Sequence, residues 1–245
     1  MAETFRYTLT EEARLIYSSI TEKSAPRGVA NATPKYSATF GVSKTDFDAI
    51  VKLEVEAIKS EMGEFSGNPG EYYLACTSGE SAAKRALAKA ELDARGKPAD
   101  EAFKIKEKAE KRAETYRQFA GILTASSQFD IELAKLENGR IVDIPATEVA
   151  KAQAGKDLFF PGAWVAPAVA FKGFRRKQMD GKDGVTAYLQ NVLFVRKGER
   201  LGGNAPANSE VFGGFKGYSP EDPTALAPGG GDSSADDFGS DVSDF

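Results

Sequence analysis

Apolar and polar residues alternate in several stretches of the chain, and this alternation predicts β-strands. The clearest stretch runs from Lys35 to Val42 and has apolar residues at every second position: Tyr36, Ala38, Phe40 and Val42. Because alternate residues of a strand share a face, this set is expected to point into a core. Further strands are expected over 14–20, 71–77, 129–136, 140–144, 164–174 and 185–196. Leu15 and Tyr17 are expected on one face of their strand, and Phe129, Ile131 and Leu133 on one face of theirs.

Two regions follow helical spacing instead. The first begins at Ser43 or Thr45, either of which can cap a helix, and is expected to end near Gly63. The second, residues 80–119, predicts two helices broken at residues 96–98. It carries eleven basic and eight acidic residues and only a thin apolar stripe. This region is therefore either a solvated scaffold or oligomer contact, or a basic arm that touches phosphates.

Shorter signals complete the organisation. Residues 137–140 read Glu-Asn-Gly-Arg, a hairpin turn of the Asn-Gly type, and residues 146–154 predict a short helix. From Ser219 onward the sequence is low in complexity and is expected to be disordered. We therefore expect a mainly β domain over 1–216, interrupted by a helical insertion at 79–120, and a disordered acidic tail over 217–245.

Composition excludes several kinds of chemistry. The chain has no histidine and one cysteine, Cys76, which lies among apolar residues and is expected to pack in the core. Catalytic Ser/His/Asp and Cys/His arrangements and Cys/His zinc sites are thereby excluded. Neither a carboxylate cluster with calcium-loop spacing nor a glycine-rich phosphate loop is found in the sequence. We expect a binding protein without cofactor or metal rather than an enzyme, and an intracellular location because no secretory or membrane-spanning pattern is recognised.

Charge is distributed unevenly along the chain. The net charge is −4, but Tyr218 to Phe245 holds seven acidic residues and no Lys or Arg, which leaves the remainder at +3. The tail residues expected to act in binding are Asp236, Asp237, Phe238, Asp241, Asp244 and Phe245. Such a tail can occupy the protein's own basic groove in competition with DNA, or insert its aromatic tip into a pocket on a partner; an inert solubility tail is the alternative.

The two long C-terminal strands combine aromatic rings with cations. In the strand 164–174, one face carries small residues together with Trp164, Lys172 and Phe174, and a basic loop follows. Aromatic rings stack nucleobases, and cations bind phosphates, so this surface is expected to bind single-stranded DNA. The candidate residues are Lys35, Lys44, Trp164, Lys172, Phe174, Arg175, Arg176, Lys177, Tyr188, Arg196, Lys197 and Arg200.

Several segments resemble phage-encoded single-stranded DNA-binding proteins. They are Pro34-Lys35-Tyr36-Ser37-Ala38-Thr39, Gly162-Ala163-Trp164-Val165, the run from Val185 through Leu189-Gln190-Asn191-Val192 to Gly203, and the closing Asp244-Phe245. The resemblance implies an OB-like β-barrel that binds single strands without strong sequence preference in phage DNA replication, recombination and repair. It also implies that the tail, through Asp241, Asp244 and Phe245, recruits replication partners such as a polymerase, helicase or primase. For a phage protein, the location would be the cytoplasm of the bacterial host.

Two other functions are open at this point. The chain could be a protein-interaction or virion scaffold module that uses the helical insertion, and it could form a homo-oligomer. It could also be a metal-dependent nuclease, although the lack of histidine and of a carboxylate cluster makes this the weaker alternative.

Overall fold

The computed structural model describes residues 3–25, 32–176 and 181–201. Lys177 and the acidic tail lie outside these residues. Strands make up 37% and helices 35% of the described part. The domain expected to be mainly β therefore contains almost as many helical residues as strand residues. In chain order the elements are β1 (Phe5–Thr8), β2 (Ala13–Ser24), β3 (Lys35–Val42), α1 (Lys44–Met62), η1 (Pro69–Glu71), β4 (Cys76–Ser78), α2 (Gly79–Asp93), α3 (Ala99–Arg117), β5 (Gly121–Ser127), β6 (Glu132–Glu137), β7 (Arg140–Asp143), α4 (Glu148–Asp157), β8 (Trp164–Phe174) and β9 (Gly184–Arg196).

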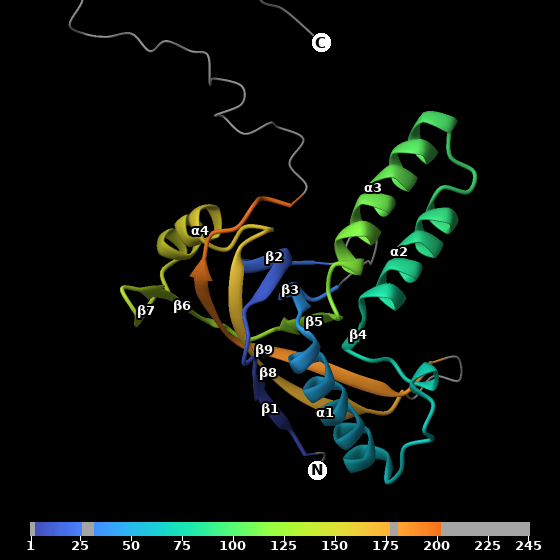
Figure 1. Cartoon of the computed structure of the whole chain (residues 1–245), viewed down its shortest axis with the longest axis horizontal. Coiled ribbons are helices and arrows are strands. Elements are labelled where there is room, and N and C mark those ends of the chain that lie inside the picture. The colour runs from blue at the N-terminus through green and yellow to red at the C-terminus, as the bar shows by residue number, and fades with distance from the viewer. Residues whose placement is uncertain (1–2, 26–31, 177–180, 202–245) are drawn as a thin grey trace, which may run out of the picture. The chain divides into compact units, whose positions relative to one another are not determined.

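Five strands pair in a ring (Figure 1). The order is β2, β3, β5, β9 and β8, and β8 pairs again with β2 through Ala13 opposite Val165 and Arg14 opposite Trp164. All these pairs are antiparallel except β5 with β9, which is parallel. Outside the ring, β1 pairs with β8, β4 with β5, and the β6–β7 hairpin with β9.

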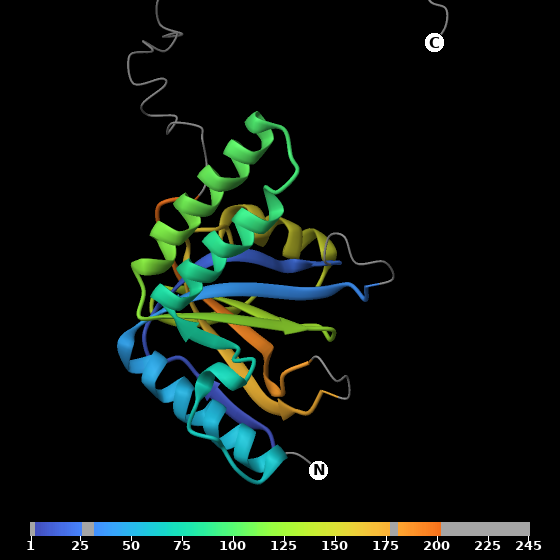
Figure 2. The ribbon, with the colours of Figure 1, turned by 90° about the vertical axis from the view of Figure 1, so that its right-hand side faces the viewer.

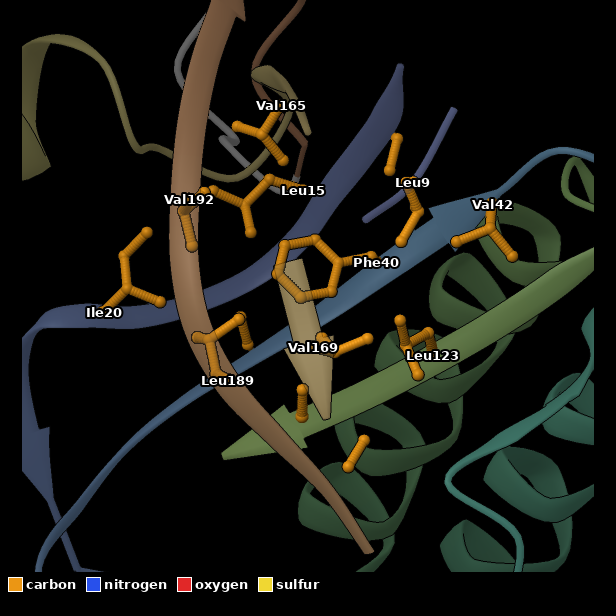
Figure 3. Close-up of a cluster of buried hydrophobic side chains, with 14 of the residues drawn as sticks. Leu9, Leu15, Ile20, Phe40, Val42, Leu123, Val165, Val169, Leu189 and Val192 are labelled. Atoms are coloured by element: carbon orange, nitrogen blue, oxygen red, sulfur yellow. The ribbon is translucent and has the colours of Figure 1, made fainter. Parts of the chain in front are cut away.

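The core lies inside this ring. The alternation predicted for residues 35–42 is confirmed, because Tyr36, Ala38, Phe40 and Val42 are all buried. Figure 3 shows Phe40 among aliphatic side chains from the other strands of the ring, including Leu15, Val169 and Leu189. Each large apolar side chain buried in this way contributes roughly 1.5–3 kcal/mol to stability.

Helix α1 packs against β8 on the outside of the ring. The predicted ends of the helix are confirmed: the Ser43 hydroxyl accepts a hydrogen bond from the Asp46 N–H, and Gly63 ends the helix with φ +88°. The approach to β8 is close, because a Cβ at Gly173 would lie 2.4 Å from the carbonyl oxygen of Ala57. A glycine at this point of β8 therefore allows the helix to lie directly on the strand.

The helical hairpin and the β-hairpin form where the sequence predicts them. Figures 1 and 2 show α2 and α3 side by side, projecting from the strands. At the base of the hairpin the Gly79 N–H donates to the Ala120 carbonyl, and Arg117 Nε lies 3.3 Å from Glu80 Oε2. Between β6 and β7, Asn138 and Gly139 both have positive φ, as the two-residue Asn-Gly turn requires. No helix in the described ranges is both long and apolar enough to cross a membrane.

Three strand predictions were wrong in detail. A register shift in β2 between Leu15 and Tyr17 buries the first and leaves the second 51% exposed, because a bulge reverses the alternation. Phe129 is 80% exposed, since β6 begins only at Glu132. The stretch 71–77 is mostly not a strand: its first residue ends η1, and pairing with β5 starts at Cys76. The Tyr73 backbone instead lies beside the start of β9: its N–H donates to the Asp183 carbonyl, and its carbonyl accepts from the Val185 N–H.

Candidate nucleic-acid interface

A groove of about 520 Å³ lies between the α2–α3 hairpin and the outer side of the strands. Its lining residues are Tyr73, Leu74, Ala75, Thr77, Ala82, Arg85, Ala86, Lys89, Arg112, Tyr116, Ile122, Thr124, Ser126, Phe174, Arg176, Val185, Thr186 and Ala187. They come from β4, β5, β8, β9, both hairpin helices, the segment before β4 and the loop after β8. The groove is therefore formed where the lower part of the insertion stands beside the strands (Figure 1).

The strand side of the groove carries hydroxyls and aromatic rings. Thr124 and Ser126 point outward from β5, since their neighbours Leu123 and Ala125 are buried. Phe174 ends β8, and Arg176 follows with its guanidinium carbon 4.9 Å from the centre of the Tyr73 ring. The Arg176 backbone N–H also donates to Asp183 Oδ1 at 2.8 Å, which fixes the start of this loop.

The helical side of the groove carries cations. Arg85 and Lys89 are four residues apart on α2, and Arg112 and Tyr116 are four apart on α3, so each pair shares a helix face. Lys89 Nζ lies 2.7 Å from Asp93 Oδ2, whereas Arg85 and Arg112 form no ion pair within the described part of the chain. Guanidinium groups without carboxylate partners are available to an anionic ligand.

The charge of the groove has one sign. Four cations and three aromatic rings line it, and no carboxylate does among residues 3–25, 32–176 and 181–201. A larger cavity of about 870 Å³ between α4, β2 and β3 differs in this respect, because three carboxylates accompany its four cations. The groove beside the hairpin is therefore the better match to a polyanion.

Several candidates predicted from the sequence lie in or next to this groove. Phe174 and Arg176 line it directly. Tyr188 is 43% exposed on β9, in register with Ser126 of β5 and Ala170 of β8. Lys172 is exposed on β8 opposite Thr186, another groove residue. The structure thus brings these four side chains to one end of β8 and β9.

Trp164 lies at the other end of β8, between two arginines. It is half-buried and in register with Arg14 on β2 and Arg196 on β9. The guanidinium carbons of these residues lie 4.9 and 4.6 Å from the centre of its ring. Arg196 Nε donates to Glu12 Oε2 at 2.8 Å, so part of this positive charge is compensated. Lys197 and Arg200 are exposed just beyond, and Arg200 lies over the Phe160 ring at 4.2 Å.

The remaining candidates are spread over other surfaces. Lys35 is half-buried at the start of β3, and Lys44 forms an ion pair with Asp48 on α1. Arg175 donates to the Glu61 carbonyl at 3.0 Å and so stabilises the C-terminal end of α1. Lys177 and the tail candidates lie outside the described residues.

Sequence reasoning left open a basic arm in residues 80–119 but named no residue on the helical side of the groove, and it did not select Tyr73. The i, i+4 spacing of Arg85 with Lys89 and of Arg112 with Tyr116 was visible, but it is a common feature of exposed helices. Only the packing of the hairpin beside β5 and β9 selects these residues from the many cations of the insertion.

The buried carboxyl group of Glu54, on α1, binds the backbone of β4. Glu54 is 1% exposed, and its Oε1 accepts the Cys76 N–H at 2.9 Å, while Oε2 has no partner within the described part of the chain. Burial raises the pKa of Glu54 to about 8, and burial together with Glu54 raises that of the Cys76 thiol. The buried position predicted for Cys76 is confirmed. In the described ranges, no group of three or more His, Cys, Asp or Glu residues could hold a metal ion.

A ring of paired strands with an aromatic, carboxylate-free groove has the features of a nucleic-acid-binding protein. The sequence matches the family described as "Enterobacter phage Enc34, ssDNA-binding protein" over residues 7–224. The chain belongs to this family of phage single-stranded DNA-binding proteins.

Solved structures of phage proteins are also similar. The C-terminal truncation of the bacteriophage Enc34 single-stranded DNA-binding protein aligns with 80% of this chain and 87% of its own, at 14% identity and a TM-score of 0.50, which shows a shared fold. The Enc34 protein in complex with ssDNA aligns over 81% and 89% at 15% identity and a TM-score of 0.47. Bacteriophage T7 gp2.5, a single-stranded DNA-binding protein, aligns over 89% and 99% at 12% identity and a TM-score of 0.44. No curated protein sequence matches the chain.

Proposed function

We propose that this chain binds single-stranded DNA in the groove beside the helical hairpin and coats it without strong sequence specificity during phage DNA replication, recombination and repair. The observation that carries the proposal is the lining itself: four cations and three aromatic rings, without a carboxylate among the described residues. Membership of the Enc34 family gives the class of ligand independently of that lining.

The ring of strands supports the assignment as an OB-like barrel. Its pairing order closes on itself, with a single parallel pair between β5 and β9. OB folds are five-stranded barrels that bind oligonucleotides on one strand face and the adjoining loops. The groove lies on β5 and at the start of the loop between β8 and β9, which is in keeping with that mode of binding.

In the proposed mechanism, cations neutralise phosphates and rings stack bases. Arg85, Arg112 and Arg176 are the phosphate contacts, because none of them has a carboxylate partner in the described ion pairs. Tyr73 and Phe174 are the stacking residues, and each base stacked on a ring contributes roughly 1–3 kcal/mol. Such stacking accepts any base, which accounts for weak sequence preference.

The strand also contacts residues beyond the groove in this proposal. Tyr188 and Lys172 extend the surface across β9 and β8, and Trp164 with Arg196 forms a second contact at the far end of β8. Lys35, Lys44, Arg175, Lys177, Lys197 and Arg200 add positive charge around this path.

The acidic tail is proposed to compete with DNA and to recruit replication proteins. The support is its composition: seven carboxylates without a cation, and phenylalanine at positions 238 and 245. Deletion of residues 217–245 is expected to tighten DNA binding, because the competing carboxylates are removed. An unchanged DNA affinity would contradict competition. Loss of co-elution with a purified phage polymerase, helicase or primase tests recruitment.

Two adjacent positions on α2 provide a test of the groove. Arg85 lines it, whereas Lys84 is exposed outside it with its Nζ 3.7 Å from Glu80 Oε1. In a fluorescence anisotropy titration with labelled oligo-dT, Arg85→Ala is expected to weaken binding about tenfold and Lys84→Ala less than about twofold. Equal effects of the two variants would place the DNA elsewhere on the molecule.

A further inference from the structure

The groove continues into a second, smaller furrow on the hairpin itself. This furrow of about 210 Å³ lies between α2 and α3 and includes Ile105 and Lys108 in its lining. Ala86, Lys89 and Arg112 line both the furrow and the groove. The two hollows therefore lie next to each other on the hairpin.

The charges of the hairpin are segregated toward these two hollows. Of its eleven cations and eight carboxylates, four cations and one carboxylate line the groove or the furrow: Arg85, Lys89, Lys108, Arg112 and Asp93. Seven cations and seven carboxylates lie on the rest of the hairpin. The net positive charge of the insertion is thus confined to the side that faces the groove and furrow.

The side chains between the helices are small. Ala90 and Ala109 are buried along the furrow, and Ala86 lies at its boundary with the groove. Alanines at this position leave a hollow with cations at its rim, instead of the interlocked large side chains of a helix pair built only for stability. Ile105 adds an apolar surface that a base can contact.

We propose that the α2–α3 hairpin is an arm of the DNA-binding site: a single strand that fills the groove continues into the furrow, where Lys108 and Arg112 bind its phosphates. This inference rests on the proposed function. From Ile105 to Arg112 the furrow follows about 10 Å of helix, at about 1.5 Å per residue. Lys108 and Arg112 are one helical turn apart along it, so they can bind neighbouring phosphates of the same strand.

The arm predicts an effect that depends on oligonucleotide length. Lys108 lines the furrow but not the groove, and Lys106, two residues earlier on α3, is exposed and lines neither. Binding of oligo-dT of about 6 and about 20 nucleotides to the full chain is measured by anisotropy at several salt concentrations. Lys108→Glu is expected to weaken binding of the longer oligomer about fivefold and to reduce its salt slope by about 0.7, while binding of the shorter changes less than about twofold. Lys106→Glu is expected to change neither by more than about twofold.

The outcomes separate the arm from the groove. If both variants weaken long oligomers equally, or if Lys108→Glu affects both lengths alike, the hairpin is not an arm, although the groove can still bind DNA. If the unmodified chain binds neither oligomer, the proposed function itself fails. Circular dichroism melting of both variants verifies that the helices remain folded.

Discussion

The guanidinium group of Arg176 lies over the ring of Tyr73, with its carbon 4.9 Å from the ring centre. The two residues are far apart in sequence, and the loop after β8 and the segment before β4 bring them to the same end of the groove. A cation held against an aromatic ring offers a phosphate contact beside a stacking surface, which is what a single strand requires at each nucleotide.

Arg176→Ala is expected to weaken binding of oligo-dT about tenfold and to lower the slope of log affinity against log salt by about 0.7, because one phosphate contact is lost. Arg95→Ala is the control, since Arg95 is exposed on the hairpin and lines neither the groove nor the furrow. Anisotropy titrations over a range of salt measure both quantities. An unchanged slope in Arg176→Ala, or an equal loss in Arg95→Ala, would contradict the assignment of Arg176.

Trp164 is the only tryptophan and reports on the far end of β8. Phe174, in the groove, and Trp164 are the two ends of an 11-residue strand, so they lie roughly 33 Å apart at about 3.3 Å per residue. A bound strand must therefore run the length of β8 to contact both ends. Emission of Trp164 is therefore expected to be quenched by long oligo-dT and not by oligomers of about three nucleotides. Quenching by the short oligomer would place Trp164 in the primary site, and none at any length would leave it a structural residue.

Glu54 is expected to make stability depend on pH. Its pKa is about 8 in the folded chain against an ordinary 4.5, so the folded state retains a proton that the unfolded state releases. Its contribution is complete below about pH 4.5 and is lost as the pH rises toward 8, by up to about 1.4 kcal/mol per pH unit. Urea unfolding at several pH values is expected to show a flatter profile for Glu54→Gln than for the exposed control Glu56→Gln. Parallel profiles for the two variants would show that Glu54 titrates normally.

Asp46 connects α1 to the segment between β1 and β2. It is fully buried, and its carboxylate accepts hydrogen bonds from the Tyr7 hydroxyl at 2.7 Å and from the Thr10 and Glu11 N–H groups at 2.9 and 3.1 Å. Burial alone would raise the pKa of Asp46, but hydrogen bonds from Thr10, Tyr7 and Glu11 outweigh it and lower the pKa.

Asp46→Asn is accordingly expected to cost about 1.5–3 kcal/mol at neutral pH, because an amide N–H replaces one acceptor. The difference from the unmodified chain should shrink as the pH falls below the ordinary pKa of 3.8 toward the lower folded-state pKa, because the unfolded state then binds a proton that the folded state does not yet bind. Denaturant unfolding at pH 7 and pH 3 measures it, with the exposed Asp48→Asn as control. A loss of stability that is the same at both pH values would point to packing in place of charge.

The sequence by itself determined the local elements. Alternation in residues 35–42, the cap at Ser43, the stop at Gly63 and the Asn-Gly turn each depend on neighbours a few residues away, so they could be read without knowing the fold. The lack of histidine is also evident from the sequence alone, and it favoured a binding protein over an enzyme with a catalytic histidine.

Tertiary structure decided which residues share a surface. The bulge after Leu15 reversed the face of Tyr17, and Trp164 came to lie between arginines of two other strands. Arg85 and Arg112 became groove residues because the lower part of the hairpin stands beside β5. Contacts between segments distant in sequence depend on how whole elements pack, and a local pattern of residue types carries no record of that packing.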